Sequence, residues 1–147
     1  MLTIRDPKKI PVEIVDPFYR RFGWISNGDI KVKVQYEAQR GFKSGLPLSF
    51  VRIKLDKMSD RNQDSRAINL ALICEIITRN TRKYDIKFVI DEQSVGVILV
   101  ETSIAGAAVY RDRMTRIFEE AGFENNIMIH AFAFEDMYDK IIEHNHE

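Results

Sequence analysis

Two runs rich in β-branched and aromatic residues, 84–91 and 95–102, are joined through the polar residues 91–94. In the first run, Ile86, Phe88 and Ile90 alternate with their neighbours, which is the period of a strand with two different faces. Because so short a connection joins neighbouring strands as a hairpin, the two runs predict an antiparallel pair. Any fold for this chain must therefore contain an antiparallel sheet.

Three further segments, 30–37, 48–55 and 127–134, also alternate along their length and predict strands. We expect the first two to pair as an antiparallel hairpin with one solvated face, and a short strand at 12–15 to precede them. That solvated face would carry four cations, namely Lys31, Lys33, Arg52 and Lys54.

Residues 60–79 predict a helix. Asp60 and Gln63 have the spacing of a capping box, and only two polar residues occur between Ala67 and Ile77. A helix that is apolar on nearly every side is expected in the middle of the core. Cys74, which lies within this segment, is expected to be a small buried hydrophobic residue.

Residues 103–122 predict a second helix with well-marked ends. Ser103 is suited to the N-cap, and Gly122 stands where a left-handed residue follows the last turn. Phe123 would then contact Phe118, as the hydrophobic partners of a Schellman motif do. A positive φ at Gly122 is therefore expected.

The order of these elements predicts an α+β fold: a mixed, mainly antiparallel sheet of about five to six strands. Two main helices and a short C-terminal helix over 135–144 would pack on one side of it. We expect a single domain over 1–147, in which 1–29 is an irregular segment with a short helix after Pro17. The residues expected in the core are Ile68, Leu72, Ile76, Phe88, Ile90, Leu99, Tyr110, Met114, Phe118, Ile129 and Phe132.

Composition favours a soluble, cytoplasmic protein. The chain is 45% hydrophobic and 30% charged, which suits a globular core, and it has no run of 18 apolar residues that would cross a membrane. Its single cysteine excludes an internal disulfide and the cysteine-rich zinc modules.

The zero net charge hides an asymmetry. Residues 1–57 contain 12 basic and 6 acidic side chains, whereas residues 58–147 contain 10 basic and 16 acidic ones. Opposite charges on the two halves favour attraction between copies of the chain, and a basic half is also typical of nucleic-acid binding. Solvated faces without a partner would give the same counts.

No complete catalytic motif is present, so we expect no catalytic residue, cofactor or metal. The chain lacks the nucleophile, phosphate-loop and dinucleotide motifs, and two of its three histidines, His144 and His146, lie at its end. One divalent-metal alternative stays open, because three acids flank the predicted hairpin: Asp91, Glu92 and Glu101. Acidic residues that simply form the turns of a hairpin would give the same sequence pattern.

One segment, residues 107–124 with the sequence AAVYRDRMTRIFEEAGFE, follows a predicted strand. It resembles a helix of the Gcn5-related N-acetyltransferases, in which alanine and tyrosine precede a closing Gly-Phe. That resemblance implies acyl-CoA-dependent N-acetyl transfer. The stretch that would bind the pyrophosphate, residues 63–68, departs from the family because Arg66 replaces a glycine.

We therefore expect a small binding or regulatory protein that acts through protein–protein contact, as a homo-oligomer or with another protein, without chemistry of its own. The acetyltransferase is the first alternative, and a nucleic-acid-binding protein that uses the basic hairpin is the second. The residues expected to bind the partner are Lys31, Lys33, Arg52, Lys54, Trp24 and Tyr19.

Overall fold

The computed structural model describes residue 24 and residues 27–55, 63–91, 94–123 and 127–134. The elements in chain order are α2 (Asn27–Ser44), β1 (Ser49–Leu55), α3 (Gln63–Arg79), β2 (Ile86–Asp91), β3 (Ser94–Leu99), α4 (Ile104–Glu120) and β4 (Ile127–Ala133). The short strand, short helix and C-terminal helix expected over 12–15, 17–22 and 135–144 lie outside the described residues.

The four strands form one sheet in the order β2-β3-β1-β4, and each neighbouring pair is antiparallel. The predicted hairpin of β2 and β3 is present, with Asp91 opposite Ser94 at its closed end. The α+β class is therefore confirmed. The described sheet has fewer strands than expected, since one segment expected to be a strand is helical.

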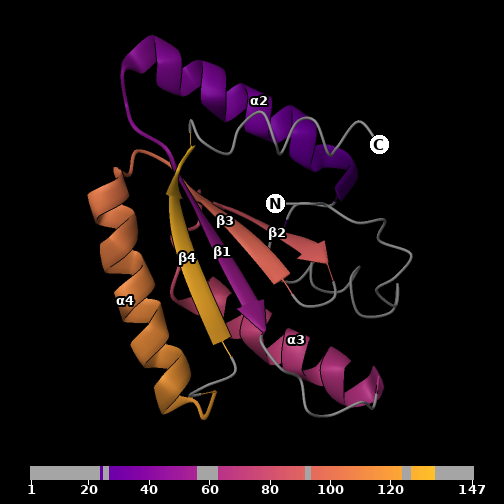
Figure 1. The fold of residues 1–147 in the computed structure, drawn as a ribbon. Helices are drawn as coiled ribbons and strands as arrows, with labels where there is room; N and C mark the ends of the chain where they lie inside the picture. The colour runs from indigo at the N-terminus through magenta and orange to yellow at the C-terminus, as the bar shows by residue number, and fades with distance from the viewer. Residues whose placement is uncertain (1–23, 25–26, 56–62, 92–93, 124–126, 135–147) are drawn as a thin grey trace.

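Helices cover both faces of the sheet (Figure 1), whereas we expected them on one side. Helices α3 and α4 pack on one face, where Val51 and Ile53 of β1 contact residues such as Met114. Helix α2 packs on the other face, where Ile30 belongs to a cluster with Phe50. The alternation of side chains along β1 thus supplies two separate core layers.

The predicted strand over 30–37 is wrong, because these residues belong to α2. The segment satisfies two periods at once: Ile30, Val34 and Ala38 recur every fourth residue and are all buried. A strand would have buried Val32 and Tyr36 as well, but these side chains are 69% and 58% exposed. Packing against the sheet favours the helical period over the strand period. The predicted basic hairpin of 30–37 with 48–55 is therefore absent from the described sheet.

Helix α3 is confirmed, but it is not enclosed on all sides. Ile73, Cys74 and Ile77 form one buried stripe, whereas Leu72 is 44% exposed and the expectation that it is a core residue is wrong. No described helix is long and apolar enough to cross a membrane.

Most of the expected core is confirmed. Among the residues whose side chains the structure describes, Phe88, Ile90, Leu99, Tyr110, Met114 and Phe118 are buried, and Ile76, Ile129 and Phe132 are partly buried. The Ile68 side chain lies outside the described part.

Both ends of α4 form as predicted. The Ser103 hydroxyl accepts a hydrogen bond from the Gly106 N–H at 3.2 Å. At the other end Gly122 has a φ of 95°, and the Phe123 N–H donates to the Phe118 carbonyl at 2.9 Å. The rings of Phe118 and Phe123 meet edge to face, with centroids 6.0 Å apart. These contacts satisfy the last carbonyl groups of the helix.

Gly122→Ala should lower the free energy of unfolding by about 1 kcal/mol, because a Cβ is disfavoured at positive φ. Nothing lies within 4 Å of the position that a Cβ would occupy, so the loss would come from the backbone alone. Gly122→Asn is the control, since asparagine tolerates this conformation better. Urea unfolding measures both, and an alanine variant as stable as the wild type would contradict the argument.

Candidate functional site

The six residues expected to bind a partner do not form one surface. Trp24 is buried and its indole N–H donates to the Thr78 hydroxyl at 2.7 Å, so it is a structural residue and not an exposed anchor. Tyr19 and the Lys31 side chain lie outside the described residues. Lys33 lies on α2, apart from the strand that carries the other two cations.

Arg52 and Lys54 remain together on β1, on the same face as Phe50, which is the face toward α2. His130 of β4 stands directly opposite Arg52 in the strand register and is exposed, while Arg52 and Lys54 are half-buried. We refer to Arg52, Lys54 and His130 as the basic sheet face. It lies across the two strands β1 and β4, the second of which is an edge strand of the described sheet.

The basic sheet face contains polar atoms without partners. Arg52 Nε is shielded from solvent and makes no hydrogen bond, and the same is true of Ser94 Oγ, whose residue is paired with Lys54 in the β1–β3 register. A buried donor without an acceptor costs about 1–3 kcal/mol, so such atoms are usually paired with a protein group, an ordered water or a bound ligand. The chemistry of the surrounding side chains favours an anionic group.

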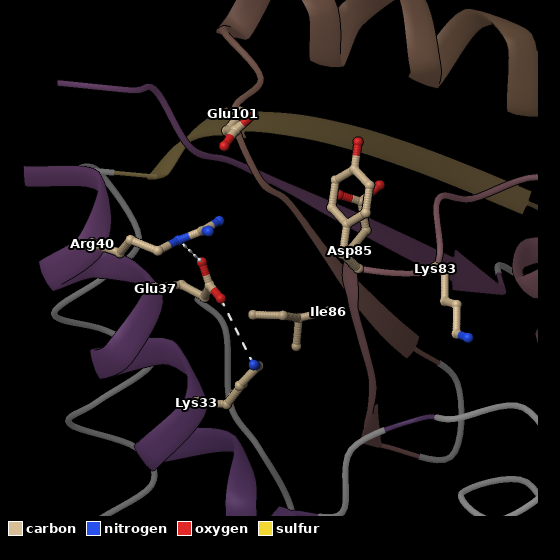
Figure 2. Close-up of a pocket in the computed structure, with 8 residues that line it drawn as sticks. Lys33, Glu37, Arg40, Lys83, Asp85, Ile86 and Glu101 are labelled. Atoms are coloured by element: carbon tan, nitrogen blue, oxygen red, sulfur yellow. Dashed lines mark hydrogen bonds and ion pairs between the residues drawn. The ribbon is translucent and has the colours of Figure 1, made fainter. Parts of the chain in front are cut away.

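A cavity of about 660 Å³ lies between α2 and the turn that precedes β2 (Figure 2). We refer to it as the α2 cavity. Its walls come from three segments of the chain: α2, the turn into β2 with the first residue of β2, and Glu101 shortly after the end of β3. The lining residues are Lys33, Glu37, Arg40, Lys83, Tyr84, Asp85, Ile86 and Glu101.

Glu37 forms the floor of the cavity on the α2 side and is buried although it carries a carboxylate. Arg40 Nε donates to Glu37 Oε2 at 3.1 Å, and Lys33 Nζ lies 3.7 Å from Oε1. Both partners come from the same helix, at the spacings of three and four residues that place side chains side by side. One acid thus orients two cations of α2, of which only Lys33 belongs to the predicted partner surface.

Asp85 is buried on the opposite wall and is held by a fork of hydrogen bonds. Arg82 Nε donates to Oδ2 at 2.9 Å and Arg82 Nη2 donates to Oδ1 at 3.0 Å. The buried N–H of Val100 also donates to Oδ1, at 3.1 Å. This arrangement fixes the turn before β2 to the end of β3.

Lys87 stabilises the same turn through its amino group. It is buried, and its Nζ donates to the carbonyl oxygens of Asp85 at 3.0 Å and Arg82 at 3.3 Å. Burial lowers the pKa of Lys87, and the negative charge of Asp85 acts in the opposite direction.

Glu101 has a φ of 51°, a left-handed conformation that is uncommon for a residue with a side chain. Its neighbours are fixed on both sides. The Val100 N–H donates to Asp85 Oδ1 at 3.1 Å, the Thr102 N–H donates to the Pro47 carbonyl at 2.9 Å, and the Thr102 carbonyl accepts from the Ser49 hydroxyl at 2.8 Å. The surrounding hydrogen bonds therefore maintain a backbone conformation that the residue itself disfavours.

Glu101→Gly should be more stable than Glu101→Gln by about 1 kcal/mol, because glycine removes the strain of the left-handed conformation. Both variants lose the carboxylate, so their difference isolates the backbone contribution. Thermal and urea unfolding of the two variants would measure it. A glutamine variant that is as stable as the glycine variant would show that no strain is stored at this position.

Two of the three acids considered for a divalent metal, Asp91 and Glu101, lie near opposite ends of β3. Asp91 lies at the closed end of the β2–β3 hairpin, opposite Ser94, whereas Glu101 follows Leu99, which pairs with Ser49 at the other end of β3. Glu92 is outside the described residues. In the part of the chain that the structure describes, no three histidine, cysteine, aspartate or glutamate residues are grouped to hold a metal.

The acetyltransferase alternative would be favoured by a splayed pair of parallel strands with a central cleft. All the pairings between described strands are antiparallel. The stretch expected to approach a pyrophosphate, 63–68, belongs to α3 and its side chains are outside the described set.

The sequence reasoning missed the residues that shape the α2 cavity. Glu37 and Arg40 were hidden by the wrong strand assignment, which put Glu37 on a solvated face. Arg82 and Asp85, three residues apart before a strand, gave a usable signal, because this spacing suits an ion pair across a turn.

No protein-family model matches the chain, and no curated protein matches it in sequence. Solved structures do match in shape. A DGC protein from Thermotoga maritima has a TM-score of 0.63 and 17% identity over 89% of this chain and 98% of that chain. The FimX GGDEF domain from Pseudomonas aeruginosa has a TM-score of 0.63 and 9% identity over 85% and 86% of the two chains. The chain therefore has the fold of these GGDEF-type domains.

Proposed function

We propose that this chain is a regulatory domain that acts by binding another protein, without a reaction of its own, and that the basic sheet face is the contact surface. The likeness to GGDEF-type domains supports a small regulatory domain. The observation that carries the proposal is the grouping of Arg52, Lys54 and His130 on one face, where Arg52 Nε has no hydrogen-bond partner among the described residues.

A carboxylate is the acceptor that fits this face best. A guanidinium pairs well with the two oxygens of an aspartate or glutamate, and in Arg52 the terminal nitrogens would make this contact, since Nε is shielded from solvent. Lys54 adds a second positive charge next to Arg52 on the same face of β1. An acidic surface that approaches across the β4 edge would meet the half-buried guanidinium of Arg52 and be attracted by both cations.

A second copy of the chain is the first partner to consider. Residues 58–147 carry the excess of acidic side chains, whereas the described positions in that range contain equal numbers of acidic and basic residues. The acidic excess is therefore concentrated outside the described residues. Since the whole chain has zero net charge, two copies are not repelled at long range and their unlike halves attract.

A protein partner is favoured over a nucleic acid. Single-stranded nucleic acids need exposed aromatic rings as well as cations. On the basic side of β1 the ring of Phe50 is fully buried, and Phe132 of β4 is partly buried. The buried thiol of Cys74 also suits a reducing cytoplasmic compartment, where we place the protein in this proposal.

Sedimentation velocity tests the proposal, with the wild type compared with an Arg52→Glu/Lys54→Glu variant. We expect the wild type to associate, and we expect high salt and the double variant each to weaken association by about tenfold. The matched control is Lys43→Glu/Lys83→Glu, which reverses two exposed charges away from the basic sheet face. Circular dichroism would check that all variants are folded.

Two results would contradict the proposal in different ways. A wild type that stays monomeric at every concentration would exclude the second copy as the partner. Association that is unchanged in the double variant would exclude the basic sheet face. Binding of a fluorescent oligonucleotide that is lost in the same variant would indicate a nucleic-acid ligand instead.

A further inference from the structure

The charged groups of the α2 cavity fall into two classes. The buried carboxylates of Glu37 and Asp85 already have cationic partners within 4 Å. Three other groups keep binding capacity. Arg40 uses only Nε, while Lys83 and Glu101 take part in no hydrogen bond or ion pair between described residues.

Arg40 and Glu101 face each other across the cavity, one from α2 and the other from the residues after β3 (Figure 2). No ion pair joins them in the described part of the chain. A cation and an anion that are separated by an open space are complementary to a molecule that carries both charges.

The backbone of Glu101 is an independent indication. Its φ of 51° is held by hydrogen bonds of both neighbours, Val100 and Thr102, and residues held in such conformations cluster at ligand sites. The residue with this conformation is one of those that line the cavity (Figure 2).

The size and charge of the cavity narrow the ligand class. About 660 Å³ is within the range of small-molecule sites, and the wall offers the aromatic ring of Tyr84 and the aliphatic side chain of Ile86 beside the charges. Two of the three groups with spare capacity, Arg40 and Lys83, are cationic, and one is anionic. A ligand with one more negative than positive charge would balance them.

We propose that the α2 cavity binds a free amino acid with an acidic side chain, whose ammonium group pairs with Glu101 and one of whose carboxylates pairs with Arg40. The second carboxylate would pair with Lys83 once that side chain turns inward from its position in Figure 2. This site is separate from the basic sheet face and does not depend on the protein-contact proposal. The cavity would make the domain responsive to a small metabolite.

Isothermal titration calorimetry with L-glutamate tests the proposal on the full chain. We expect saturable binding of one molecule per chain, and about tenfold weaker binding of glutarate, which lacks the ammonium group, and of L-glutamine, which lacks the second carboxylate. Arg40→Gln should abolish binding. Glu101→Gln should remove the preference for L-glutamate over glutarate. Lys43→Gln, which changes an exposed cation of α2 that does not line the cavity, should bind as the wild type does.

The experiment separates this proposal from the previous one, because the Arg52→Glu/Lys54→Glu variant should bind L-glutamate normally. Absence of saturable heat with folded wild-type protein would overturn the amino-acid site. Equal affinity for glutarate and L-glutamate would also overturn it, since Glu101 would then have no role. The Arg40→Gln variant could unfold because Glu37 loses its partner. In that case the ratio of the affinities of Glu101→Gln for L-glutamate and glutarate still tests the amino-acid site.

Discussion

Replacing Asp85 with alanine should lower the free energy of unfolding by about 3 kcal/mol, one of the largest effects expected of a single polar side chain in this domain. The substitution removes three hydrogen bonds, two from Arg82 and one from the N–H of Val100. Arg82 is partly exposed and can turn to solvent, but the buried N–H of Val100 cannot. Most of the loss therefore comes from an orphaned backbone donor.

The matched control is Glu75→Ala. Glu75 forms an ion pair with Arg79 on the surface of α3, at 2.6 Å, and both side chains are partly or largely exposed. Exposed pairs contribute less than about 1 kcal/mol, so this variant should be nearly as stable as the wild type. Urea unfolding of both variants measures the contrast. Equal effects would mean that Asp85 is no more important than a surface acid.

Gly96→Ala should cost about 3 kcal/mol, because a Cβ on Gly96 would lie 2.5 Å from the ring of Phe88. The two residues are opposite each other on β3 and β2, and Phe88 is fully buried with its ring against Phe50. Since the ring has no free space to move into, the strands must separate. Glycine in this strand is needed for close approach of a side chain and not for a turn.

A second substitution tests that explanation. Phe88→Leu alone should destabilise the fold through a cavity, but in combination with Gly96→Ala it should recover part of the loss, since the shorter side chain leaves room for the new Cβ. Denaturant unfolding of the two single variants and the double variant gives the coupling energy. Purely additive losses would show that the ring does not cause the effect of Gly96→Ala.

The elements predicted correctly are those in which local and tertiary signals agree. The β2–β3 hairpin combines β-branched runs with a short polar connection, and α4 has both a capping serine and a closing glycine. Each of these signals acts within a few residues along the chain. Such features can be predicted without knowing what packs against them.

The secondary structure of α2 could not be predicted from local signals. Its buried residues, Ile30 and Val34, fit a strand and a helix equally well, and the difference lies in whether Val32 and Tyr36 have a partner. The sheet offers α2 one face only, so those two side chains stay exposed. The exposure of Leu72 has the same cause, because α3 has the sheet on one side and solvent on the other.

The site was only partly predictable for a related reason. Arg52 and Lys54 share a face because alternation along a strand is a local property, and this part of the prediction is correct. His130 joins them only through the pairing of β4 with β1, far away in the sequence. The α2 cavity likewise needs three separate segments, and Trp24 could not be recognised as buried before its hydrogen bond to Thr78 was known.

A fluorescent label on the basic sheet face is the most direct test of the protein-contact proposal. Met128 is a suitable position, because it is opposite Lys54 in the register, is exposed, and is not one of the cations. Cys74 should not react with the label, since burial raises the pKa of its thiol. A Met128→Cys protein carrying an environment-sensitive dye should change its emission as the protein concentration rises, and high salt should reverse the change. The same dye on Lys83→Cys should not respond. A response at Lys83→Cys with none at Met128→Cys would contradict the assignment of the basic sheet face as the contact surface.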